Sequence, residues 1–167
     1  MASNAPTLHL ICGKIAAGKS TLAARLGCAP NTVVISEDDW LSALFADEIK
    51  TGQDYVRFAT KLKAVIGPHV ADLLNAGLSV VLDFPANTVE FRRWMLGILE
   101  ATDADHVLHV LDVPEDVCLA RLRARNSAGD HAFAANEEQF RRFSEFFVPP
   151  SPEEGFNVVR VGDEPRI

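Results

Sequence analysis

Eight consecutive residues, Gly13 to Ser20, match the phosphate-binding loop pattern G-x-x-x-x-G-K-[ST] at every fixed position. Both glycines tolerate backbone angles that side chains resist, so the loop can wrap around a phosphate chain and direct its N–H groups inward. Lys19 is expected to lie along the β- and γ-phosphates, and the Ser20 hydroxyl is expected to hold Mg²⁺. The motif therefore predicts a site for ATP and Mg²⁺.

The segments around this loop favour a phosphate site over a glycine-rich turn with no ligand. The apolar residues 8–12 are typical of a buried strand, and residues 21–26 are typical of a helix. A strand that leads into such a loop, followed directly by a helix, is the context the motif requires. The predicted nucleotide-binding residues in and beside the loop are Gly13, Lys14, Ile15, Ala16, Ala17, Gly18, Lys19, Ser20 and Thr21.

A run of acidic residues, Glu37 to Asp39, follows the second predicted strand. Ser36 with Asp39 has the spacing of a helix capping box, which gives this run a structural explanation. Its position after a strand also suits a carboxylate that faces the transferable phosphate and accepts the proton of an attacking hydroxyl. Asp38 is the predicted base, and Glu37 and Asp39 remain the alternatives.

A second acidic position ends the apolar run 78–82, which has the form of a Walker B strand. Asp83 is predicted to lie near the Mg²⁺, through water or the nucleotide, or to contact the substrate. A turn-forming role before Phe84 and Pro85 is the alternative. Asn87, with Arg92 or Arg93, is a weaker candidate to line the same part of the site as Asp83.

Several arginines lie at the C-terminal end of the helix predicted over 114–125. Arg121 and Arg125 are four residues apart and share a helix face, where a phosphate chain would relieve their mutual repulsion. They are predicted to bind the triphosphate and stabilise the transition state, although cations also suit a helix C-terminus. The polar stretch 126–131 is a candidate mobile loop within a lid at about 121–136, and His131 is the only histidine expected to touch a ligand.

The remaining pattern predicts one α/β domain with a doubly wound parallel sheet. Ligands in such sheets bind beyond the carboxyl ends of the strands, where the acidic candidates lie. The phenylalanines at 140, 143, 146 and 147 are expected to pack in the core, and the charged residues Glu137, Glu138, Arg141 and Arg142 to form a solvated helix face. Strands are expected at 7–12, 32–35, 78–82, 106–111 and 157–161, and helices at 20–26, 39–46, 55–75, 89–101, 114–125 and 137–147.

Composition narrows the class of partner. The formal net charge of −7 disfavours extended contact with nucleic acid and fits a small-molecule substrate better. No apolar stretch has the length of a membrane span, and the first six residues are not expected to form a signal peptide. Three scattered cysteines are expected to be free thiols in a reducing cytoplasm. We expect a monomer or weak homodimer.

Taken together, the loop, the Ile-Ser-Glu-Asp run, the Val-Val-Leu-Asp strand and the Arg-Leu-Arg-Ala-Arg-Asn segment resemble the zeta-toxin-like P-loop kinases, from Thr7 to about Val161. The resemblance implies a three-layer P-loop NTPase fold with five parallel strands in the order 2-3-1-4-5 and a small lid. It also implies catalytic roles for Lys19, Asp38, Arg121 and Arg125 in transfer of a phosphoryl group from ATP to a hydroxyl.

The chain also departs from particular members of that group. Leu41 stands where the polynucleotide kinases usually carry an arginine, three residues beyond the base, and residues 83–87 replace the glycine triplet of shikimate-type kinases. A small-molecule kinase is therefore the leading hypothesis. The alternatives are a polynucleotide 5′-hydroxyl kinase and a nucleotide-dependent switch ATPase with no acceptor.

Overall fold

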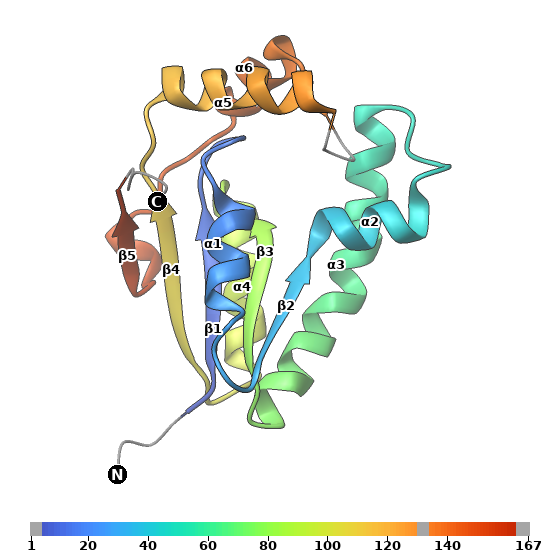
Figure 1. Ribbon diagram of the computed structural model, residues 1–167. Helices are drawn as coiled ribbons and strands as arrows, with labels where there is room; N and C mark the ends of the chain where they lie inside the picture. Colours follow the sequence, from blue (N-terminus) through green and yellow to red (C-terminus); the bar gives the residue numbers. More distant parts are fainter. Residues whose placement is uncertain (1–4, 130–133, 163–167) are drawn as a thin grey trace.

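A computed structural model of the chain describes residues 5–129 and 134–162. Strands and helices alternate through the chain (Figure 1). The strands are β1 (Thr7–Cys12), β2 (Thr32–Ser36), β3 (Ser79–Pro85), β4 (Asp105–Leu111) and β5 (Val158–Val161). The helices are α1 (Lys19–Leu26), α2 (Glu37–Phe45), α3 (Gly52–Asn75), α4 (Val89–Glu100), α5 (Glu115–Ala128) and α6 (Glu137–Glu145), with a 3₁₀ turn at Pro152–Glu154.

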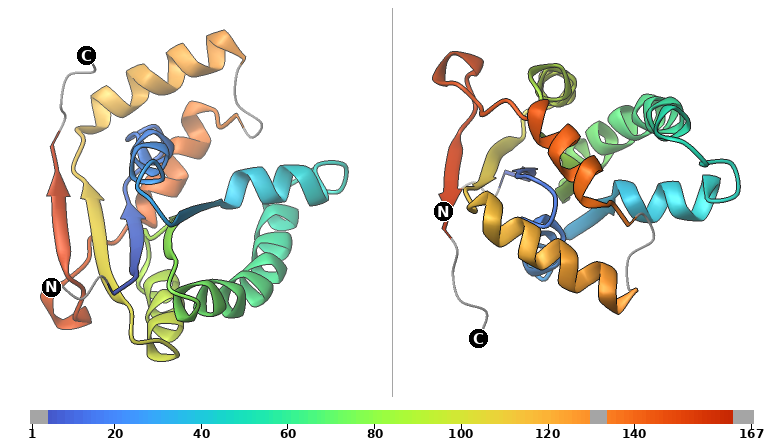
Figure 2. Two further views of the ribbon diagram at one scale, coloured as in Figure 1. Left: turned by 60° about the horizontal axis from the view of Figure 1, so that its bottom comes forward. Right: turned by 90° about the horizontal axis from the view of Figure 1, so that it is seen from above.

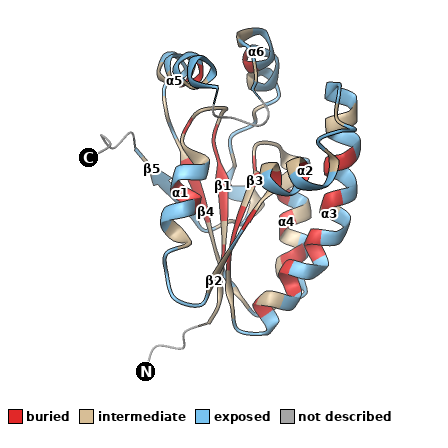
Figure 3. Ribbon diagram, turned by 45° about the vertical axis from the view of Figure 1, so that its right-hand side comes forward, coloured by how far each residue is buried: buried red, intermediate tan, exposed pale blue. Residues whose placement is uncertain are grey.

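The five strands form one parallel sheet in the order β2-β3-β1-β4-β5, which confirms the expected fold class and strand order. Alternate residues of β1 serve opposite faces, as the two-residue period of a strand requires. Leu8 and Leu10 pack with apolar residues of α3 and α4, whereas Ile11 packs with Leu22 and Ala23 of α1. The buried residues accordingly gather in the central strands β1, β3 and β4 and on the sheet-facing side of α3, whereas the edge strand β5 is exposed (Figure 3).

Local signals explain where the helices that frame the site begin. The Ser36 hydroxyl accepts the N–H of Asp39 at 3.3 Å, so α2 starts at Glu37, earlier than predicted. Thr51 and Asp54 form a capping box at the start of α3, and Thr88 caps α4. These caps fix the first turns of α2 and α4 at the carboxyl ends of β2 and β3.

Helices α5 and α6 form an arm across the carboxyl ends of the strands (Figures 1 and 2). Helix α5 continues to Ala128, so the first half of the predicted mobile loop is helical, and Gly129 ends the helix in the left-handed region at φ 70°. The predicted ligand contact of His131 lies outside the described residues. In the described part of the chain, no helix combines the length and apolarity that crossing a membrane requires.

Candidate nucleotide and acceptor site

The phosphate-binding loop lies between β1 and α1, as the sequence predicts. Gly18 is the N-cap of α1 with φ 104°, a conformation that side chains rarely adopt, and no side chain caps the helix. The first N–H groups of α1 are therefore not used by a capping side chain. Such a helix start, with its positive dipole end, is a ready site for a phosphate.

Asn87 holds the first glycine of the loop through both ends of its amide. Its Oδ1 accepts the N–H of Gly13 at 2.9 Å, and its Nδ2 donates to the carbonyl of Gly13 at 2.8 Å. Gly13 is also tightly packed, because an added Cβ would come within 3.2 Å of side-chain atoms of Ala17 and Leu111. Asn87, at the end of β3, thus fixes the point where the chain leaves β1.

Lys19 lies inside the loop and is bonded to the loop backbone. Its Nζ donates to the carbonyls of Gly13 at 2.8 Å and Lys14 at 2.9 Å. Burial lowers the pKa of Lys19, while the carboxylates of Asp83 and Asp38 act in the opposite direction. A buried ammonium of this kind is suited to neutralise a phosphate chain that enters the loop.

Ser20 and Asp83 supply the oxygen atoms that a magnesium site needs. The Ser20 hydroxyl donates to Oδ2 of Asp83 at 3.1 Å, across the carboxyl ends of β1 and β3. Asp83 lies within β3 and not in a turn, and burial raises its pKa while the Ser20 bond lowers it. A hydroxyl and a carboxylate fit Mg²⁺, which takes oxygen ligands and usually keeps several from water and phosphate. Among the described residues, no group of three or more His, Cys, Asp or Glu is arranged to hold a metal ion, so the nucleotide and water would complete the shell.

The three acidic residues that start α2 have different environments. Asp39 is exposed, and Glu37 is buried against α3. Asp38 lies close enough to the phosphate side for its charge to oppose the lowering of the Lys19 pKa and to contribute to the raised pKa of Asp83. Asp39 also contributes to the raised pKa of Asp83, whereas Asp38 acts on Lys19 and Arg125 as well, so the charge of Asp38 reaches more of the groups around the phosphate loop.

The α5–α6 arm brings both predicted arginines toward this site. Nη1 of Arg121 donates to the carbonyl of Ala17 in the loop at 3.4 Å. Burial lowers the pKa of Arg125, and the Asp38 carboxylate opposes that shift, which places Arg125 within range of Asp38. Arg123, by contrast, points outward and pairs with Glu137 of α6. The spacing of Arg121 and Arg125 thus does place both on the inner face.

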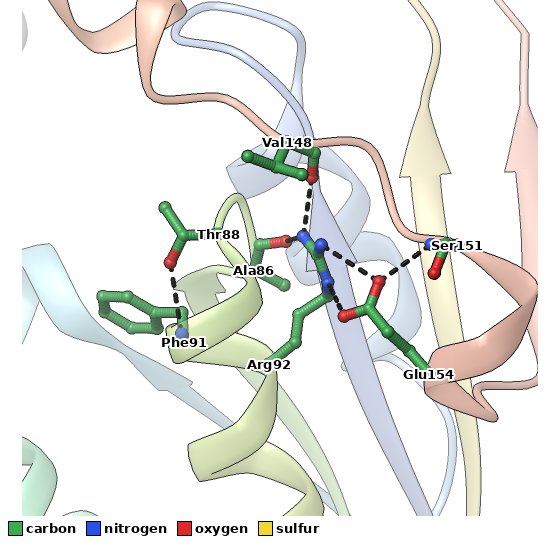
Figure 4. Close-up of polar contacts among 7 residues, drawn as sticks. All are labelled: Ala86, Thr88, Phe91, Arg92, Val148, Ser151 and Glu154. Atoms are coloured by element: carbon green, nitrogen blue, oxygen red, sulfur yellow. Dashed lines mark hydrogen bonds and ion pairs between the residues drawn. The ribbon is translucent and has the colours of Figure 1, made fainter.

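Arg92 does not line the site beside Asp83, which corrects one sequence-based prediction. Its side chain is fully buried and pairs with both carboxylate oxygens of Glu154, at 2.8 and 3.2 Å (Figure 4). Its Nη1 also donates to the carbonyls of Ala86 and Val148. These bonds tie the β3–α4 junction to the segment that follows α6, so Arg92 is a structural clamp.

The phenylalanine prediction was wrong in part. Phe140 is fully buried with Cys118 and Leu122 of α5, but Phe143 and Phe146 are 51% and 65% exposed. The reason is that α6 contributes only Phe140 to the buried apolar cluster that it shares with α5.

A cavity of about 100 Å³ lies between α2, α3 and the β3–α4 junction. We call it the α2–α3 cavity; Glu37, Tyr55, Val56, Lys63, Pro85 and Phe91 are among its lining residues. The Tyr55 hydroxyl donates to Oε2 of Glu37 at 3.2 Å. Sequence reasoning named Glu37 only as an alternative base, although its i,i+4 spacing from the buried Leu41 indicated an inward-facing position.

Comparison with known proteins agrees with this arrangement. A family model described as an AAA domain matches residues 8–150. The chain belongs to this AAA domain family. No protein of curated function matches the sequence significantly.

Solved structures similar to this AAA domain share its fold at low sequence identity. A candidate kinase from Chloroflexus aurantiacus J-10-fl is 18% identical with a TM-score of 0.76, over 96% of this chain and 87% of that one. Chaetomium thermophilum Kti12, in complex with ADP-AlF3, is 12% identical with a TM-score of 0.72, over 94% and 89%. The Mycobacterium tuberculosis APS kinase CysC, in complex with AMPPNP and APS, is 18% identical with a TM-score of 0.61, over 96% and 90%. The fold is therefore that of P-loop kinases.

Proposed function

We propose that this AAA domain is a kinase of the zeta-toxin-like P-loop group, which transfers the γ-phosphoryl group of ATP to a hydroxyl of a small molecule. One observation supports the proposal: the charge of Asp38 acts on the pKa values of both Lys19 and Asp83, the two groups expected to meet the phosphates and Mg²⁺. A nucleotide-binding switch needs no carboxylate at that place, whereas a kinase needs a group there to accept the proton of the acceptor hydroxyl.

Each group of residues at the site has a separate role in the proposed reaction. Lys19, the N–H groups of the loop and the start of α1 hold the phosphates, and Arg121 and Arg125 approach from the arm. Asp38 takes the proton as the acceptor oxygen bonds to the γ-phosphorus and the bond to ADP breaks. Ser20 and Asp83 would hold Mg²⁺, which neutralises charge on the phosphates when it is bound.

The environment of Leu41 supports a small acceptor over a polynucleotide. Leu41 is fully buried in the core with Ile35 and Phe58. A guanidinium at this position would be in the core and not at the mouth of the site, so α2 does not offer the arginine usual in polynucleotide kinases. The formal net charge of −7 points the same way.

The decisive experiment compares Asp38→Asn with Asp39→Asn in an assay of ATP consumption over a panel of alcohols, sugars, nucleosides and 5′-hydroxyl oligonucleotides. Loss of a general base should lower acceptor-dependent turnover by about 10²–10⁴-fold in Asp38→Asn, with ATP binding retained. Asp39 is the matched control because it is the exposed neighbour in the same helical turn. Turnover that no acceptor raises, and that Asp38→Asn leaves unchanged, would contradict a kinase and favour the switch.

A further inference from the structure

Glu37 lines the α2–α3 cavity and carries an unsatisfied polar atom. The residue is 2% exposed, and its Oε2 accepts the hydroxyl of Tyr55. Its Oε1 is buried and has no hydrogen-bond partner among the described residues. Buried polar atoms are nearly always paired, and leaving one unpaired is destabilising by about 1–3 kcal/mol. An unsatisfied atom on a residue that lines a cavity suggests that a polar group of a ligand is its missing partner.

The rest of the cavity restricts what that group can belong to. Val56, Pro85 and Phe91 provide apolar walls that suit a short or cyclic carbon skeleton. Lys63 lines the same cavity, with its Nζ 4.0 Å from the centre of the Phe91 ring. Lys63 repels a cationic acceptor and the carboxylates of Asp38 and Asp83 repel an anionic one, so a neutral acceptor fits better.

The protonation of Glu37 favours a hydroxyl as its partner. Burial raises the pKa of Glu37 to about 7, and the nearby charges of Asp38 and Asp83 add to this, while the Tyr55 bond and Lys63 oppose it. Both protonation states are therefore populated near neutral pH. A hydroxyl donates to the ionised carboxylate and accepts from the protonated one, whereas an ammonium serves only the ionised form.

We propose that Glu37 is a specificity-determining residue for the acceptor, and that the acceptor is a neutral polyol. One hydroxyl would face Asp38 and react, and a neighbouring hydroxyl would bond Oε1 of Glu37 in the α2–α3 cavity. Glu37 and Asp38 are consecutive in the first turn of α2, and although their side chains point in different directions the charge of Asp38 acts on the Glu37 carboxyl, so hydroxyls on neighbouring carbons can bridge the two. This inference rests on the proposed kinase function, because it assigns the acceptor side of that same site.

The test uses three probes with one carbon skeleton: trans-1,2-cyclohexanediol, cyclohexanol and trans-2-aminocyclohexanol. Dissociation constants are measured by NMR titration without ATP, and transfer is measured separately with ATP. The diol should bind at least about tenfold more tightly than either of the others, the effect of one hydrogen bond to a charged group. Equal binding of the three probes would overturn the inference.

Variants test whether the preference for the diol comes from residues of the α2–α3 cavity. Glu37→Leu should abolish it, Glu37→Gln should retain most of it, and the exposed Glu48→Gln is the control that should leave it unchanged. Lys63→Met, at a half-buried position that does not threaten the core, should improve binding of the amino alcohol. If Glu37→Leu keeps the preference, or Lys63→Met leaves the amino alcohol excluded, the inference fails.

The two readouts separate this inference from the kinase proposal. Glu37-dependent binding of the diol without any transfer would support the polyol cavity and count against the kinase. Transfer that is equally fast with the diol and with cyclohexanol, and that Glu37→Leu does not change, would support the kinase and overturn the polyol cavity.

Discussion

In the phosphate-binding loop the polar groups bond to one another, whereas in the α2–α3 cavity Glu37 has a buried carboxylate oxygen with no hydrogen-bond partner among the described residues; Nε of Arg125, on the α5–α6 arm, is another such atom. Asn87 holds Gly13, Ser20 holds Asp83, and Lys19 bonds the loop backbone. In the α2–α3 cavity, Glu37 is held by Tyr55 through one oxygen only. The difference indicates that the phosphate-binding loop already has the shape that its ligand needs. In the α2–α3 cavity, by contrast, the hydrogen bonds are completed only when a ligand binds.

Substitution of Arg92 gives the strongest test of how much the stability of the fold depends on the bonds that hold the β3–α4 junction. Arg92→Met removes a fully buried cation and leaves Glu154 unpaired, so we expect the free energy of unfolding to fall by about 3–5 kcal/mol in urea denaturation. Arg93→Met is the matched control, since Arg93 is the exposed next residue. A loss as small as that of the control would mean that the clamp does not support the fold.

Lys19→Met, in the phosphate-binding loop, separates the effect on phosphoryl transfer from the effect on thermal stability. The variant should lose about 10²–10³-fold in phosphoryl transfer because a preformed positive group at the phosphates is gone. Its midpoint of thermal unfolding should stay equal or rise, because burial already disfavours the charged form of Lys19. Lys50→Met, on the surface, should change neither quantity. A large fall in the midpoint for Lys19→Met would show that the ammonium holds the loop together.

On the α2–α3 side, pH provides the test. The pKa of Glu37 is raised to about 7 in the folded protein, so the folded state binds more protons than the unfolded state from about pH 4.5 to 7. Stability should therefore fall as pH rises through this window, by roughly 3 kcal/mol at most, and Glu37→Gln should lack this part of the fall. The measurement is the difference in unfolding free energy between the two proteins at pH 5 and pH 8. A difference that does not vary with pH would contradict the burial of an ionisable Glu37.

The smallest expected effect concerns the amide that fixes the loop. Asn87→Ala removes both bonds to Gly13, and we expect about 1–3 kcal/mol of lost stability together with weaker ATP binding by calorimetry. Asn75→Ala is the control, because Asn75 is exposed and makes one long bond to a carbonyl. Unchanged ATP affinity in Asn87→Ala would mean that the loop keeps its shape without the amide.

Sequence patterns predicted the elements and the phosphate loop because both depend on neighbouring residues. The motif and its flanks form one continuous segment, residues 8–26, and the strands are short apolar runs. The partners of Asn87 and Arg92 could not be predicted, because they lie 74 and 62 residues away in the chain and depend on how the elements pack. The same holds for the bond between Glu37 and Tyr55, whose helices had first to be placed side by side.

The clamp at the β3–α4 junction has a consequence for how this protein can diversify. Arg92 and Asn87 link that junction to the phosphate loop and to the segment after α6, but neither bonds to α2 or α3 through a contact seen in the described residues. Substitutions at Val56 or Lys63 can therefore reshape the cavity without loosening the nucleotide site. The architecture allows evolution, or a protein engineer, to exchange one acceptor for another while the source of the phosphoryl group stays fixed.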